Sequence, residues 1–107
     1  MRAKIVTGAR ALTSPANGGA TVLSNTSSVT LMTTSDYRKS FSVTNQGTTI
    51  VYVKLGDSAT SSSWHYILPG GGAADDGNGG SVSIDGYAGQ VSVCSASTGR
   101  VSFVEFG

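Results

Sequence analysis

Apolar and polar residues alternate in short runs along most of the chain, and turn-forming residues separate these runs. In residues 38–44, for example, Phe41 and Val43 fall on one side and serines fall on the other. This period of two is typical of a β-strand with one buried face. Such runs predict strands at 20–24, 28–33, 38–44, 49–55, 64–68, 81–85, 90–95 and 100–106. Short strands with turns about every ten residues predict an all-β fold: an antiparallel, jelly-roll-like β-sandwich of seven or eight strands.

One member of each alternating pair is expected to point into the core. These inward residues are mostly branched aliphatic or aromatic, as suits the interior of a sandwich. The predicted core is Val29, Leu31, Phe41, Val43, Val51, Val53, Val82, Ile84, Val91, Val93, Val101 and Phe103.

Two of the predicted strands are apolar on both faces. In 49–55, Ile50 and Tyr52 lie opposite the inward valines, and in 100–106 the second face carries Val104 and Phe106. An isolated antiparallel sandwich should leave one face of each sheet in water. Strand 49–55 is therefore expected to be buried on both sides or covered by another chain. We predict partner contacts for Tyr52, Val104 and Phe106.

The first residues differ in charge from the rest of the chain. Arg2, Lys4 and Arg10 stand among residues 1–20 without any acidic residue, whereas residues 21–107 hold four basic and six acidic residues. Ile5 and Val6 add an apolar pair, and the Pro- and Gly-containing stretch 14–19 is expected to interrupt any strand. We predict an extended docking arm over 1–19, followed by a single domain over 20–107.

The loop at 70–80 is rich in glycine and is predicted to be flexible and exposed. Asp75 and Asp76 are the only candidates for binding a hard metal, but the D-x-D-x-D-G spacing of calcium loops is absent. We interpret these carboxylates as solvated charges and predict no metal and no cofactor.

Candidate catalytic residues are few. His65 is the only histidine and Cys94 the only cysteine, and the chain contains no nucleophile elbow or phosphate-binding loop. We expect Cys94 to be a small packed residue and predict that the protein is not an enzyme and has no small-molecule substrate.

Charge and hydropathy exclude two further classes of partner. A net charge of +1 leaves no basic patch for nucleic acid, and we interpret Arg38-Lys39 as a solvated pair. No apolar run approaches the roughly 18 residues that a transmembrane span needs, and residues 1–10 lack the apolar core of a signal peptide.

Aromatic residues leave one binding role open. Five of them could form a platform on which sugars stack, although sandwich cores and subunit contacts use aromatics more often. The five are Tyr37, Tyr52, Trp64, Tyr66 and Tyr87.

Four segments of residues 37–107 carry a resemblance to a known group. They read RKSFSVTNQG (38–47), IVYVKLG (50–56), ILPGG (67–71) and SIDGY (83–87). In these segments the chain resembles small virion proteins of tailed bacteriophages. The resemblance implies a non-enzymatic structural part of the particle and carries no site residues with it.

Together these observations predict a capsid decoration (cement) protein on the virion surface, made in the host cytoplasm. Its expected partners are the major capsid protein, whose neighbouring subunits it would bridge, and itself, as a symmetric homo-oligomer such as a trimer. The predicted contact residues are Arg2, Lys4, Ile5, Val6, Arg10, Tyr52, Val104 and Phe106. A tail or neck adaptor or fibre component is the alternative, and a carbohydrate-binding module is the second alternative.

Overall fold

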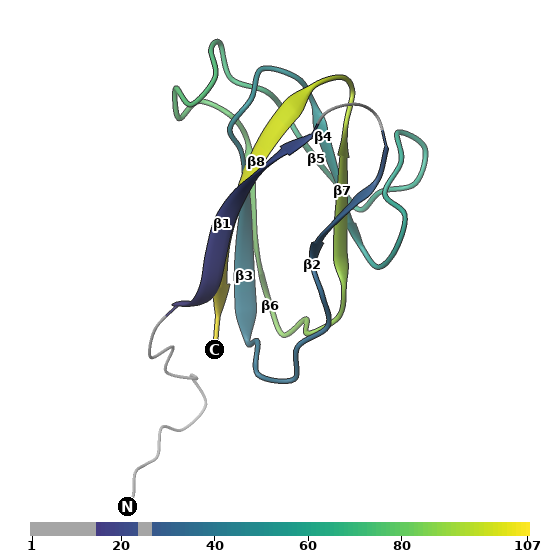
Figure 1. The fold of residues 1–107 in the computed structure, drawn as a ribbon, viewed down its shortest axis with the longest axis vertical. Helices are drawn as coiled ribbons and strands as arrows, with labels where there is room; N and C mark the ends of the chain where they lie inside the picture. The colour runs from purple at the N-terminus through teal and green to yellow at the C-terminus, as the bar shows by residue number, and fades with distance from the viewer. Residues whose placement is uncertain (1–14, 24–26) are drawn as a thin grey trace, which may run out of the picture.

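The computed structural model describes residues 15–23 and 27–107, which form eight β-strands and no helix. The strands form two four-stranded antiparallel sheets that face each other (Figure 1). This confirms the predicted all-β sandwich. Among the described residues there is no helix long and apolar enough to cross a membrane. The strands are β1 (Pro15–Leu23), β2 (Val29–Met32), β3 (Ser40–Asn45), β4 (Val51–Leu55), β5 (Tyr66–Leu68), β6 (Ser81–Asp85), β7 (Val91–Ser95) and β8 (Gly99–Phe106).

Strand pairing in both sheets is nested. One sheet has the order β1-β8-β3-β6 and the other β2-β7-β4-β5, so the first strand pairs with the last, the second with the seventh, and so inward. Along the chain, β1, β2, β3 and β4 alternate between the two sheets. Strands β4 and β5 then lie in the same sheet and form the innermost hairpin. As a result, residues far apart in the sequence become neighbours in both layers.

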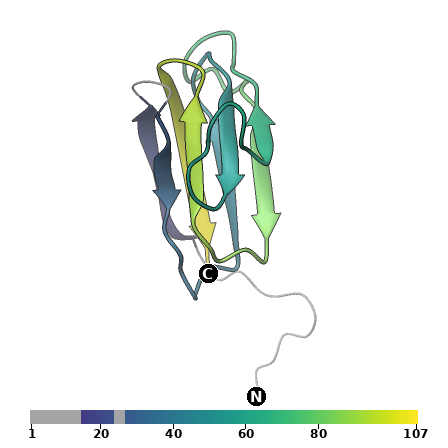
Figure 2. The same cartoon turned by 90° about the vertical axis from the view of Figure 1, so that its right-hand side faces the viewer.

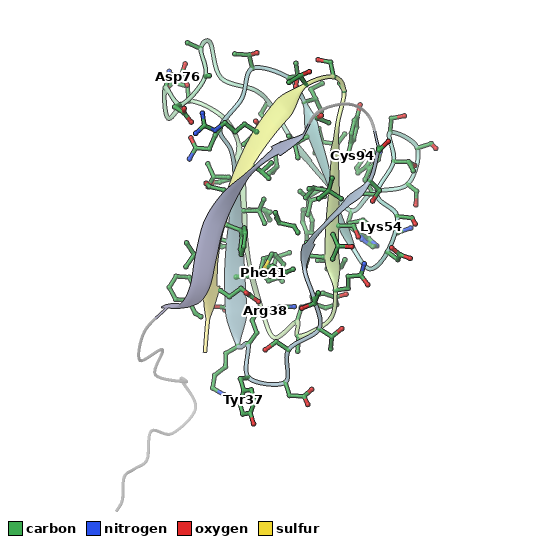
Figure 3. All side chains as sticks on the ribbon, in the orientation of Figure 1. Tyr37, Arg38, Phe41, Lys54, Asp76 and Cys94 are labelled. Carbon is green, nitrogen blue, oxygen red and sulfur yellow. The ribbon has the colours of Figure 1, made fainter. Side chains whose placement is uncertain are left out.

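The core lies between the two sheets and contains the residues that alternation predicts. All of the predicted core residues belong to one hydrophobic cluster or pack against it. Phe41 lies between the two sheets near Arg38 (Figure 3), and its ring makes an edge contact with Tyr87 at a centroid distance of 6.4 Å. Met32, Leu68, Leu55 and Tyr87 complete the cluster. Tyr87 belongs to the predicted turn 86–89, where strand periodicity gives no signal.

The boundary predicted between arm and domain is wrong. Strand β1 begins at Pro15, so residues 15–19 extend the strand that was expected to begin at residue 20. Gly18 pairs with Val104, and a Cβ atom at Gly18 would lie 3.1 Å from the carbonyl oxygen of Phe103. Glycine thus permits a close approach of the two strands. Because β1 is an edge strand, a proline at its first position costs no ladder hydrogen bond.

Arg38 is buried, contrary to the predicted solvated pair with Lys39, which is exposed. Its guanidinium lies between the sheets and forms an ion pair with Glu105 of β8. It also donates hydrogen bonds to three backbone carbonyl oxygens, those of Thr33, Tyr87 and Gly89. These contacts satisfy the charge and explain why Arg38 leaves solvent. They also join the start of β3 to the end of β2 and to the β6–β7 turn.

Asn45 has a similar role at the other end of β3. Its amide Nδ2 donates to the carbonyl oxygens of Thr49 and Leu68, at 2.8 and 3.0 Å, and lies 3.1 Å from that of Pro69. Its Oδ1 accepts a hydrogen bond from the Gly47 amide. One buried side chain therefore closes the turn after β3 and ties this strand to the opposite sheet.

The glycine-rich loop 70–80 is exposed over most of its length, but it has a defined conformation. The Asp76 carboxylate accepts hydrogen bonds from the amides of Ala73 and Asn78, each 2.8 Å long, and these bonds lower the pKa of Asp76. Asp75 pairs with Arg100 at 2.7 Å. A Cβ atom at Gly79 would clash with the backbone of Asn45. The glycines thus allow the loop to pack closely, a role that composition alone does not distinguish from flexibility.

Candidate functional site

Val104 and Phe106 lie on the outer face of the sheet β1-β8-β3-β6, as alternation predicts. Val101 and Glu105 of β8 are buried, whereas Val104 and Phe106 are half-buried. In the register, Val104 stands between Gly18 of β1 and Ser42 of β3. This face therefore presents two apolar side chains among small and hydroxyl-bearing neighbours. We call it the β8 face.

Tyr52 lies on the other outer face of the sandwich, that of the sheet β2-β7-β4-β5. It pairs with Ile67 of β5 and with Cys94 of β7, so these side chains share one side of the sheet. Its ring contacts Trp64 at a centroid distance of 6.3 Å. The predicted contact residues Tyr52, Val104 and Phe106 therefore do not form one surface, because Tyr52 is separated from the other two by the thickness of the core.

The remaining predicted contact residues, Arg2, Lys4, Ile5, Val6 and Arg10, lie outside the described residues. The position at which they join the domain is defined, however. Pro15 pairs with Phe106, so the chain enters the sandwich beside the β8 face.

Part of the outer surface of strand β4 is covered by its own chain. The segment 56–65, which follows β4, folds back over the outer face of the sheet (Figure 2). Ala59 of this segment is fully buried, as are the outward-facing Ser92 and Cys94 of β7. Strand 49–55 was predicted to be buried on both sides or covered by another chain, and its own chain supplies part of that cover. Ile50 and Ile67 are left exposed at 41% and 43%.

A partly open pocket of about 370 Å³ lies between this segment and β7. It is lined by Tyr52, Thr60, Ser61, Cys94, Ser95 and Ala96. In Figure 3, Cys94 lies on β7, on the side of the sheet that segment 56–65 covers. Burial raises the pKa of the Cys94 thiol, so at neutral pH the pocket wall carries a neutral thiol. No sequence pattern indicates this pocket, because residues 56–63 read as a polar loop.

The five aromatic residues of the predicted platform are not brought together. Tyr87 packs in the core against Phe41, and Tyr37, 84% exposed, lies near the end of the sandwich by Arg38 (Figure 3). Tyr66 pairs with the inward-facing Val53. Only Tyr52 and Trp64 lie side by side, next to the pocket.

The candidate catalytic and metal-binding residues are dispersed. His65 is exposed, and its Nδ1 accepts a hydrogen bond of 3.0 Å from the Leu55 amide, so the ring caps the end of β4. In residues 15–23 and 27–107 there is no group of three or more His, Cys, Asp or Glu side chains placed to hold a metal ion.

No protein-family model matches the chain, and no curated protein or solved structure is significantly similar to it.

Proposed function

We propose that this chain is a non-enzymatic structural protein of a bacteriophage particle, specifically a capsid decoration protein that bridges neighbouring major capsid subunits. The sequence resemblance of residues 37–107 to small virion proteins supports the class. The nested strand pairing also supports assigning the sandwich to the jelly rolls, a fold used for assembly in viral capsids.

One structural observation carries the proposed role. Strand β1 begins at Pro15, directly after residues 1–14 of the predicted basic arm, and Pro15 pairs with Phe106 at the edge of the β8 face. The arm and the β8 face can therefore engage the same shell from adjacent points. An arm reaching one capsid subunit while the β8 face rests on the next would bridge the two. Tyr52, on the opposite outer face, has no part in this attachment.

Charge favours attachment through the arm. The arm holds three basic residues and no acid, while the body from residue 21 onward has a net charge of −2. An acidic capsid surface would attract the arm and repel the body, so the arm would determine how the protein approaches. Ordering the arm costs about 1–2 kcal/mol per residue in backbone entropy, which its contacts must exceed.

Binding to purified expanded capsids that lack the protein tests this proposal. Deleting residues 2–12 leaves all the described strands intact, since β1 begins at Pro15. We expect this deletion to weaken attachment at least tenfold, or about 1.4 kcal/mol, and raised salt to weaken the full-length protein more than the deletion variant. Val104→Ser should also weaken attachment.

Two controls separate this mechanism from general effects. Lys54→Ser removes a basic side chain on the opposite outer face, and Tyr52→Ser removes an aromatic residue there; both should attach like the parent. Equal attachment of the deletion variant and the parent at low and high salt would contradict docking through the arm. Absence of the protein from purified particles by quantitative mass spectrometry would overturn the structural role itself.

Quantitative mass spectrometry also gives the copy number per particle, which separates a decoration protein from a tail, neck or fibre component. A decoration protein is present in many copies, arranged as a symmetric oligomer such as a trimer at three-fold positions. A tail or neck adaptor or fibre component is present in few copies. The third function, carbohydrate binding, has its own structural support.

A further inference from the structure

The pocket beside Tyr52 has the size and position of a ligand site. Its volume of about 370 Å³ falls within the range of roughly 300–1,000 Å³ that is usual for small-molecule pockets. It opens on the outer face of the sheet β2-β7-β4-β5, away from the β8 face that we propose for attachment. A ligand could therefore enter it while the protein is bound to a capsid.

The pocket wall is polar but carries no formal charge. Thr60 and Ser61 contribute hydroxyl groups, Cys94 a neutral thiol and Tyr52 an aromatic ring. The lining contains no Lys, Arg, His, Asp or Glu. The nearby cation Lys54 donates from Nζ to the Ser63 hydroxyl, 2.7 Å away. A wall of this kind offers no counterion to a phosphate, a carboxylate or a metal, and it suits a neutral ligand that is rich in hydroxyl groups.

An aromatic surface adjoins these hydroxyls. Trp64 is tilted by 37° relative to Tyr52 and is 41% exposed, so its ring is available to a ligand. Its indole Nε1 donates a hydrogen bond of 3.2 Å to the Ser61 carbonyl oxygen, which fixes the ring next to the pocket. Sugars present both an apolar face of C–H groups and a rim of hydroxyls. An aromatic ring beside hydroxyl-bearing side chains matches both features.

The segment that forms the outer wall is held in place by its own hydrogen bonds. Both backbone polar groups of Gly56 are hydrogen-bonded to neighbouring residues. Its amide donates to the Gln90 carbonyl oxygen at 2.8 Å, and its carbonyl oxygen accepts from the Ser92 hydroxyl at 2.7 Å. Thr60 and Ser63 exchange backbone hydrogen bonds of 2.9 and 3.2 Å. Because these hydrogen bonds already order the segment in the absence of a ligand, binding would cost little conformational entropy. This preorganisation favours a ligand-binding role for the pocket.

We propose that this pocket binds a neutral sugar residue of a glycan, with Trp64 and Tyr52 stacking on the sugar ring and Thr60 and Ser61 hydrogen-bonding its hydroxyls. The proposal is independent of capsid attachment. A protein with both properties would display a glycan-binding face on the surface of the particle.

Trp64 provides a direct test because it is the only tryptophan in the chain. We would titrate the full-length protein with soluble neutral oligosaccharides of glucose, galactose, mannose and N-acetylglucosamine, and with sialylated and sulfated oligosaccharides for comparison. At least one neutral oligosaccharide should change the Trp64 emission saturably at about 1 mM or below. No response to any neutral oligosaccharide, or a stronger response to the charged ones, would overturn the proposal.

Variants then locate the site by isothermal titration calorimetry. Thr60→Val keeps the side-chain shape but removes the hydroxyl, and Trp64→Ala removes the stacking ring; each should lower the affinity for the responding oligosaccharide at least tenfold. Tyr37→Ala removes an exposed aromatic residue remote from the pocket and should leave affinity unchanged. Thermal melting checks that all three variants fold. If folded Thr60→Val and Trp64→Ala bind like the parent, the sugar does not occupy this pocket and the proposal is wrong.

Discussion

Arg38 and Glu105, separated by 67 positions in the sequence, form an ion pair of 2.6 Å between the two sheets. The side chains are 1% and 12% exposed. The Arg38 guanidinium also lies 5.6 Å from the centroid of the Phe41 ring, so it packs on the core as well as pairing with a charge. This contact joins the start of β3 to the end of β8, beside the point where β1 begins.

Arg38→Met should destabilise the protein by about 3–5 kcal/mol, because it removes the cation paired with Glu105 and the donor to three backbone carbonyl groups. Glu105→Gln should cost less, since the Arg38 bonds to those carbonyls persist. Urea denaturation of both variants measures the difference. Equal losses would mean that the ion pair, rather than the carbonyl network, accounts for the contribution of Arg38.

Phe41 and Phe103 give a comparison within one sheet. Phe41 is 1% exposed, whereas Phe103 is half-buried on β8. Phe41→Ala should cost about 3–5 kcal/mol, because it opens a cavity that the surrounding side chains cannot fill. Phe103→Ala should cost clearly less, since water can reach part of its site. Thermal melting with circular dichroism tests this order, and a larger loss for Phe103→Ala would contradict it.

Asn45 should be intolerant of a negative charge. Asn45→Ala removes donors from buried carbonyl oxygens and should cost about 1–3 kcal/mol. Asn45→Asp is nearly the same size, but its carboxylate would face those oxygens, so it should cost more at neutral pH. Its deficit should shrink in acid, where a protonated carboxyl can donate one hydrogen bond. A pH series of urea melts on both variants checks this, and a deficit that grows in acid would refute it.

The Cys94 thiol should make stability fall at alkaline pH. Burial raises its pKa in the folded protein above the ordinary value of 9.0. Above that value the unfolded chain releases the proton first, so the free energy of unfolding decreases as pH rises, by at most about 1.4 kcal/mol per pH unit from this group. Cys94→Ala should show a shallower decline between pH 8 and about pH 11. Identical slopes for the variant and the parent would show that the thiol does not contribute.

The sequence determined the strands and the core because both depend on a local rule. Successive side chains of a strand point to opposite faces, so a run such as 81–85 reveals its strand, and Val82 and Ile84 its inner face, without reference to any partner. The outward position of Val104 and Phe106 follows from the same rule.

Tertiary structure decided everything that depends on contacts between distant segments. Arg38 reads as a surface charge until Glu105 and three carbonyl groups surround it, and residues 15–19 read as a break until β8 supplies a partner strand. The segment 56–65 became the wall of a pocket only by folding over β7. Local sequence determines which face of a strand is apolar, but strand order and loop placement determine what each face meets. Burial of a charge, closure of a pocket and separation of Tyr52 from Val104 arise at that second level.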